Sequence, residues 1–108
     1  MRMWMVNPKI MCRKHLLGEH VELHMFIGTL KKGISVKGYL DDNLMEPESM
    51  YSRHAELVAE MEARGYNHKS PLPLIPVAMQ KRVDSQASLK ELLRRCPECA
   101  ARYEENLK

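Results

Sequence analysis

Residues 10–30, IMCRKHLLGEHVELHMFIGTL, are the stretch of sequence that decides the fold. Apolar residues recur through it at helical spacing: Leu16, Leu23, Ile27 and Leu30, with Leu17, Val21 and Phe26 between them. A helix that is apolar on more than one side belongs in the interior of a domain rather than on its surface. We therefore predict that this segment forms a buried central helix.

The chain has 108 residues, of which 44% are hydrophobic. This length and composition suit one small globular domain, which we expect to span residues 1–108. No apolar run reaches the roughly 18 residues of a membrane-spanning helix. The apolar patch before Asn7-Pro8 is too short for a secretory signal. We expect a cytoplasmic protein, in a host cell or associated with a nucleoid.

Glycine and proline residues, which interrupt regular helices, divide the rest of the chain into segments. Residues 31–49 read as a loop. A second helix is predicted from after Ser49 to Arg64, with Gly65 in a left-handed conformation behind it. Residues 66–83 contain three prolines, which forbid a regular helix and favour an extended strap over the core: Pro71, Pro73 and Pro76.

A third helix is predicted to begin at Asp84 or Ser85, which are both favourable N-cap residues, and to break or bend at Pro97. Residues 98–106 are expected to form another turn or two after it. No convincing strand pattern is present. The expected fold is all-α, a compact single domain of about three helices around the buried central helix, with long loops.

Charge is distributed unevenly along the chain. Residues 1–40 carry seven Lys or Arg against two Glu, whereas residues 41–62 carry seven acids against one Arg. The first third therefore has the electrostatics of a phosphate-facing surface. The same imbalance also fits an ordinary solvated surface.

Three polar residues form one stripe on the central helix, namely His15, Glu19 and Glu22. Two carboxylates one turn apart are costly to bury without cationic partners. The stripe either faces solvent or lines a site that uses the charge.

Cys96 and Cys99 have the spacing of a zinc knuckle or a redox pair. Zinc needs two further ligands, and no second pair of this kind exists. His20 and His24, one helical turn apart, could face a metal together, whereas Cys12 is expected to be a small core residue. Reduced structural thiols remain the alternative to a zinc site.

The segment KHLLGEHVEL at residues 14–23 resembles the central helix of the pyrimidine-dimer DNA glycosylases of the phage endonuclease V type, in which the second acid is the catalytic glutamate. Residues 56–67, ELVAEMEARGYN, are similar to another helix of that family, and residues 85–89, SQASL, to the start of its last helix. The opening Met-Arg-x-Trp, followed by Asn-Pro-Lys, also looks like cellular relatives.

This resemblance implies a DNA glycosylase with abasic-site lyase activity, whose nucleophile is the α-amino group of Met1. The family's glutamate follows its terminal amine by 21 residues, and Met1 to Glu22 is the same interval. Arg2 is large enough to prevent removal of Met1. An ordinary α-amine has a pKa near 8, so a nucleophilic fraction exists at physiological pH. It would form an imine at the sugar C1′ and permit β-elimination, with Glu22 as the electrostatic and acid/base partner.

The resemblance further implies a monomer that acts on double-stranded DNA with a damaged or abasic site, and it requires no metal and no cofactor. The residues expected to contact this substrate are Arg2, His15, Glu19, Lys31 and Lys32.

Val21 and Met25 stand where the family has two arginines that grip kinked DNA, and only Tyr103 lies near the place of its aromatic tail. Pyrimidine dimers, abasic sites and other modified bases are all compatible lesions. Two other classes remain open. One is a non-catalytic nucleic-acid-binding module, supported by zinc at Cys96 and Cys99, and the other is a Met-rich protein-interaction domain.

Overall fold

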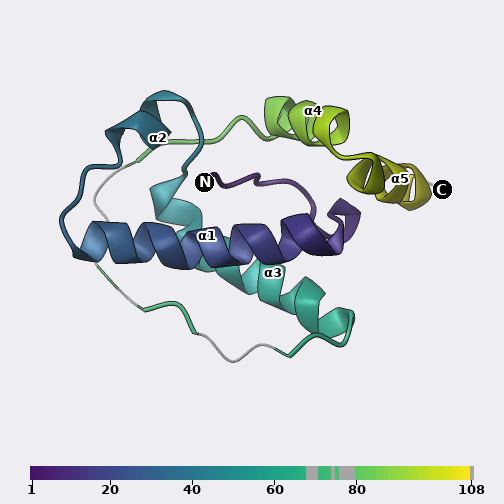
Figure 1. Cartoon of the computed structure of the whole chain (residues 1–108), viewed down its shortest axis with the longest axis horizontal. Coiled ribbons are helices and arrows are strands. Elements are labelled where there is room, and N and C mark those ends of the chain that lie inside the picture. Colours follow the sequence, from purple (N-terminus) through teal and green to yellow (C-terminus); the bar gives the residue numbers. More distant parts are fainter. Residues whose placement is uncertain (68–70, 74, 76–79, 108) are drawn as a thin grey trace.

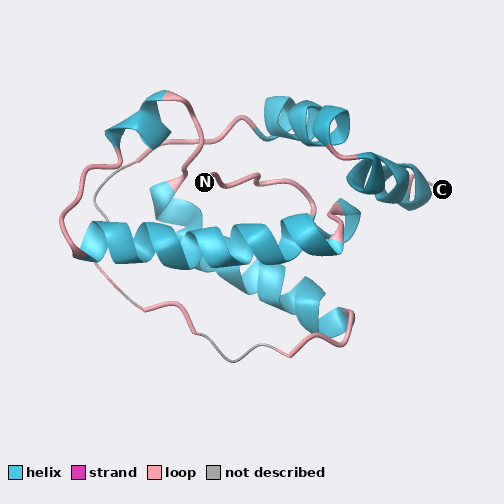
Figure 2. Cartoon of the chain, in the orientation of Figure 1, coloured by secondary structure: helices cyan, strands magenta, loops and turns pink. Residues whose placement is uncertain are grey.

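The computed structural model describes residues 1–67, 71–73, 75 and 80–107, and these residues contain five α-helices and no strand (Figures 1 and 2). The helices are α1 (Arg13–Lys31), α2 (Lys37–Asp41), α3 (Met50–Ala63), α4 (Ser85–Arg95) and α5 (Pro97–Asn106), with 3-10 turns at Pro8–Ile10 and Pro47–Ser49. The prediction of an all-α fold is confirmed. None of the described helices is long and apolar enough to cross a membrane.

Helix α1 is the centre of the fold, and α3 packs across it (Figure 1). Leu16, Leu23 and Phe26 of α1 are completely buried, as is Leu57 of α3. Each such side chain stabilises the folded state by about 1.5–3 kcal/mol relative to its exposed form. The predicted buried central helix is therefore present.

Three features differ from the sequence prediction. Helix α1 begins at Arg13 rather than Ile10, because Pro8–Ile10 forms a separate 3-10 turn that the Asn7 side chain caps. The expected loop over 31–49 contains the short helix α2. Pro97 starts a new ten-residue helix, α5, where its missing N–H costs nothing at the first helical position. The expected number of about three helices was therefore too low.

The predicted helix ends are confirmed on either side of the long loop. Gly65 follows α3 with a φ of 83°, and Asp84 caps α4 by accepting hydrogen bonds from two backbone N–H groups. The predicted strap contacts α3 through Tyr51, whose hydroxyl donates to the Pro73 carbonyl at 2.9 Å. Pro76 lies outside the described residues.

The N-terminal segment, residues 1–7, runs over α1 between that helix and α4 (Figure 1). Met3 is completely buried, and its N–H donates to the Leu44 carbonyl at 2.7 Å. Further along, the Val6 carbonyl accepts a hydrogen bond from the buried Arg53 of α3. Packing and hydrogen bonds thus fix the start of the chain against the loop at Leu44 and against α3.

Candidate active site

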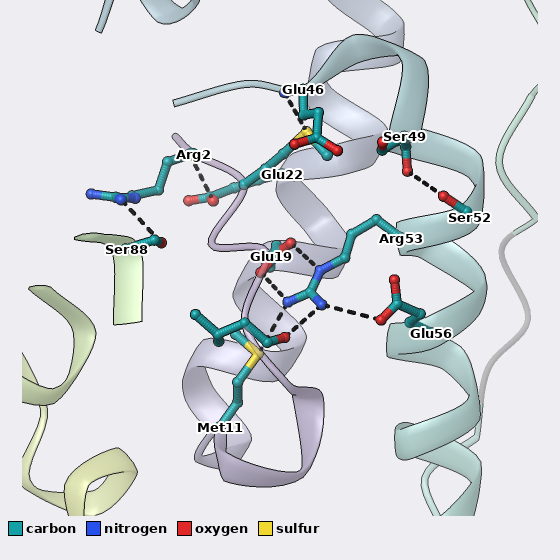
Figure 3. A network of polar contacts seen from close by, with 12 residues as sticks. Arg2, Met11, Glu19, Glu22, Glu46, Ser49, Ser52, Arg53, Glu56 and Ser88 are labelled. Carbon is teal, nitrogen blue, oxygen red and sulfur yellow. Dashed lines mark hydrogen bonds and ion pairs between the residues drawn. The ribbon is translucent and has the colours of Figure 1, made fainter. Parts of the chain in front are cut away.

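The start of the chain meets the second acid of the α1 stripe. The backbone N–H of Arg2 donates to Glu22 Oε2 at 3.0 Å, although the two residues are 20 positions apart (Figure 3). A hollow of about 380 Å³ surrounds this contact. It is lined by Met1, Arg2, Trp4, His15, Glu22, Leu44 and Arg95. One concave site therefore contains the first residue, a carboxylate and two arginines.

The Arg2 side chain is held by two contacts. Its guanidinium lies 3.8 Å above the centre of the Trp4 ring, and Nη2 donates to the buried Ser88 hydroxyl at 3.3 Å. Burial lowers the pKa of Arg2, and the neighbouring positive charge of Arg95 lowers it further. An anion beside these two arginines would relieve their repulsion, and a phosphate group suits a guanidinium fork.

Sequence reasoning missed Arg95, which enters the site from the last residue of α4. It donates to Glu91 one turn earlier, and Glu91 also accepts from Arg94. These two hydrogen bonds hold the pKa of the Glu91 carboxyl at about 2. The pair Arg94-Arg95 before Cys96 was a visible basic signal, but Arg95 and Glu22 are 73 positions apart in the sequence.

Glu19 departs from the expectation that it contacts substrate. It is only 1% exposed and accepts hydrogen bonds from Arg53 Nε at 2.6 Å and Nη2 at 2.9 Å (Figure 3). Its carboxylate is thus occupied by a bidentate ion pair beneath the surface. This placement gives Glu19 a structural task, whereas Glu22 on the same stripe reaches the hollow.

The remaining expected contacts lie in different environments. His15 lines the hollow beside Trp4, with an edge-to-face ring distance of 5.9 Å. Burial lowers the pKa of His15, and Lys14 adds to this effect. Lys31 and Lys32 are exposed at the C-terminal end of α1 and do not line the hollow.

Val21 and Met25, which replace the two arginines expected from the resemblance, lie on the surface. Val21 is 54% and Met25 is 49% exposed, one turn apart on α1. Both flank Glu22 in the sequence and lie where a basic pair would be accessible to a phosphate backbone. The present chain offers apolar side chains there instead.

His20 and His24 do face one another, as the sequence suggested, and His54 of α3 joins them. The ring centres of His20 and His24 lie 4.9 Å apart, and those of His20 and His54 also 4.9 Å. This cluster sits between α1 and α3 and contributes nothing to the hollow.

Fold and site together define an all-α protein whose N-terminal backbone is held against a helix-borne carboxylate in an arginine-lined hollow. A family model for pyrimidine dimer DNA glycosylases matches residues 1–74, and the chain belongs to that family. Searches of curated proteins and of solved structures gave no match. The matched range includes Met1, Arg2, His15 and Glu22, whereas Arg95 lies beyond it. Members of a DNA glycosylase family act in DNA repair, so DNA is the implied substrate.

Proposed function

We propose that this protein is a DNA glycosylase with abasic-site lyase activity, in which the α-amine of Met1 is the nucleophile. One observation carries the proposal, namely the 3.0 Å hydrogen bond from the Arg2 N–H to Glu22. Met1 precedes this N–H by one residue and lines the same hollow, which supports an amine on the same side of the site as the carboxylate.

The reaction follows from the chemistry of these groups. The neutral amine attacks the sugar C1′, the bond to the base breaks, and the base leaves after taking up a proton. The C1′–O4′ bond then opens as O4′ takes up a proton, and the nitrogen lone pair forms an iminium, which acidifies the 2′ hydrogen. Removal of that proton expels the 3′ phosphate, and water then hydrolyses the imine to free the amine. Glu22 stabilises the cationic sugar and iminium and transfers protons between these steps.

Binding of the DNA backbone is the proposed task of the basic side chains. Arg2 and Arg95 approach one another in the hollow and offer two guanidinium groups to a phosphate. His15 Nδ1 faces Cys12 and Cys99, so Nε2 is the ring nitrogen proposed to contact the sugar or phosphate from α1. Lys31 and Lys32 extend the positive surface, so that affinity falls as salt rises.

The proposed substrate is double-stranded DNA with a pyrimidine dimer, an abasic site or another modified base, bound by a monomer in the cytoplasm. Val21 and Met25 offer no charge to the backbone beside Glu22. Recognition of the lesion is therefore proposed to rest on Arg2 and Arg95 rather than on a basic pair on α1, with the buried Trp4 ring holding the Arg2 guanidinium in place.

Borohydride trapping tests the proposal. The protein is incubated with abasic-site duplex and borohydride, and the covalent adduct is located by mass spectrometry. We expect the adduct on the N-terminal peptide, no adduct after acetylation of the terminal amine, and a large loss in Glu22→Gln. Glu62→Gln is the matched control, because Glu62 is exposed on α3 and does not line the hollow.

An adduct on a lysine side chain would overturn the assignment of the nucleophile. Salt-sensitive binding of the duplex with neither adduct nor strand cleavage would instead support a nucleic-acid-binding module without chemistry. An adduct equally strong in Glu22→Gln and in the control would remove Glu22 from the mechanism.

A further inference from the structure

Three cysteines and a histidine from opposite ends of the chain meet beside the hollow. Cys12 and His15 come from the start of α1, and Cys96 and Cys99 from the start of α5. One ligand atom from each of the four lies within 4.8 Å of every other. The three thiols are free and buried, and no disulfide joins them.

The distances fit the edges of a metal tetrahedron. Zinc–sulfur bonds of about 2.3 Å and zinc–nitrogen bonds of about 2.0–2.1 Å imply edges of about 3.8 Å between sulfurs and about 3.6 Å between sulfur and nitrogen. Cys12 Sγ lies 3.8 Å from Cys96 Sγ, and Cys99 Sγ lies 3.7 Å from His15 Nδ1. Cys12 Sγ and His15 Nδ1 are slightly closer, at 3.2 Å.

The backbone around the cluster suits thiolates. Cys12 is the N-cap of α1 and Cys96 is the N-cap of α5, and the second ligand of each pair lies three residues further, in the first helical turn. Helix N-termini favour negative charge. The Cys12 N–H donates to Cys99 Sγ at 3.2 Å, and the Cys99 N–H donates to Cys96 Sγ at 3.4 Å. Such N–H···S contacts support a sulfur that carries negative charge.

We propose that Cys12, His15, Cys96 and Cys99 form a structural zinc site that joins α5 to the start of α1. Four protein ligands close the coordination shell, so this zinc has no open position for catalysis. Soft thiolates with one imidazole in a tetrahedron select zinc over magnesium or calcium. Three thiolates, a neutral imidazole and Zn²⁺ leave one net negative charge. Lys14 directly precedes His15 and Arg95 directly precedes Cys96, so two cations stand beside the ligands to offset this charge.

The position of this zinc explains how the C-terminal helices contribute to the hollow. Arg95 immediately precedes Cys96, so a bond from Cys96 to the metal fixes the end of α4 relative to α1. His15 contacts Trp4, on which Arg2 is stacked. A metal that joins segments distant in the sequence would add to the stability that the hydrophobic core supplies.

Metal analysis and cobalt substitution test the site. The full chain, purified with a phosphine reductant and without chelators, is expected to carry about one zinc per chain. Chelation should lower Tm, and added zinc should restore it. Cobalt(II) should give intense visible bands of tetrahedral geometry and a thiolate-to-metal charge-transfer band in the near ultraviolet.

Variants assign the ligands. Cys99→Ser should lose or strongly weaken the charge-transfer band, and His15→Ala should weaken metal binding whereas His15→Cys retains it, because sulfur also completes the tetrahedron. His24→Gln is the matched control, since it alters the separate cluster of His20, His24 and His54. Wild-type chelation and re-addition keep the test valid if a variant fails to fold.

Three results would overturn the proposal. The first is a fully reduced wild-type chain that retains no zinc and gives no charge-transfer band with cobalt. The second is metal binding that survives Cys99→Ser and disappears in His24→Gln. The third is iron as the metal retained on purification. The trapping assay with abasic DNA is a separate readout, so failure of the zinc site leaves the proposed function standing.

Discussion

Replacing Glu19 with glutamine removes the negative charge that faces Arg53 while keeping the size of the side chain. Arg53 is 1% exposed, and its Nη1 also donates to the Val6 carbonyl at 2.7 Å. The ion pair therefore holds α1, α3 and the N-terminal segment together (Figure 3). Without the Glu19 carboxylate, the positive charge of Arg53 stays buried and is poorly balanced by negative charge. Glu56, its other acidic neighbour, lies 3.7 Å away with a side chain that is 52% exposed.

Loss of one partner from a buried ion pair costs about 3–5 kcal/mol. Since Arg53 keeps the Val6 carbonyl, we expect Glu19→Gln to lie near the lower value, about 3 kcal/mol. With a urea m value of about 1–3 kcal/mol per M, the unfolding midpoint should fall by about 1–3 M. Glu56→Gln removes an exposed partner of the same arginine and should cost about 0–1 kcal/mol.

Urea unfolding followed by circular dichroism measures these differences. In the double variant Glu19→Met with Arg53→Met, both charges are gone, and much of the lost stability should return because no charge remains buried. A Glu19→Gln variant with an unchanged midpoint but weakened DNA binding would refute the structural assignment and return Glu19 to the substrate contacts.

Four further changes have defined outcomes. Gly28→Ala should stabilise the protein by about 0.5–1 kcal/mol in thermal melts, because Gly28 is inside α1 and an added Cβ meets no heavy atom within 4 Å beyond the adjoining helix backbone. Gly65→Ala should instead destabilise the protein by about 1–2 kcal/mol, because a φ of 83° is strained for an L-residue. Equal melting temperatures for the Gly28→Ala and Gly65→Ala variants would contradict these predictions. Asp84→Ala should cost about 1 kcal/mol by removing the cap of α4, with a loss of helix signal on heating. Arg95→Gln should raise the pKa of Glu91 from about 2 toward 4.5, as measured by carboxyl NMR titration. Because this pKa is depressed in the folded state, the small stabilisation from Glu91 is present above its unfolded-state pKa and disappears as pH falls through about 2. If the pKa of Glu91 were unchanged in Arg95→Gln, Arg94 alone would be responsible for lowering it.

Local pattern was enough to predict α1, α3 and α4. A run that is apolar on several sides predicted the buried helix, and Gly65 and Asp84 marked the end of one helix and the start of another. Helix α5 was underestimated because Pro97 reads as a helix breaker, although at the first helical position it is a favourable start. Short α2 lies in a segment without a buried apolar face, so periodicity gave no signal for it.

Some features of the candidate site were also predictable from local pattern, whereas others depend on tertiary contacts. Periodicity placed Glu19 and Glu22 on one stripe of α1, but only the contact with Arg53 of α3 shows which of them is buried. Arg95 was missed because nothing local connects it with the N-terminus. Cys12 and Cys96 lie 84 positions apart, and Cys12 was expected to be only a small core residue. No local pattern therefore joined Cys12 and His15 to Cys96 and Cys99.

By itself, the sequence determined the all-α class, the central helix and the interval between Met1 and Glu22, because propensity, caps and spacing act along the chain. Tertiary structure decided which charges are buried, that α4 supplies an arginine to the hollow, and that two helix N-termini bring four metal-binding atoms together. These outcomes depend on desolvation and on packing between segments distant in sequence, which are properties of the folded interior and not of any local pattern.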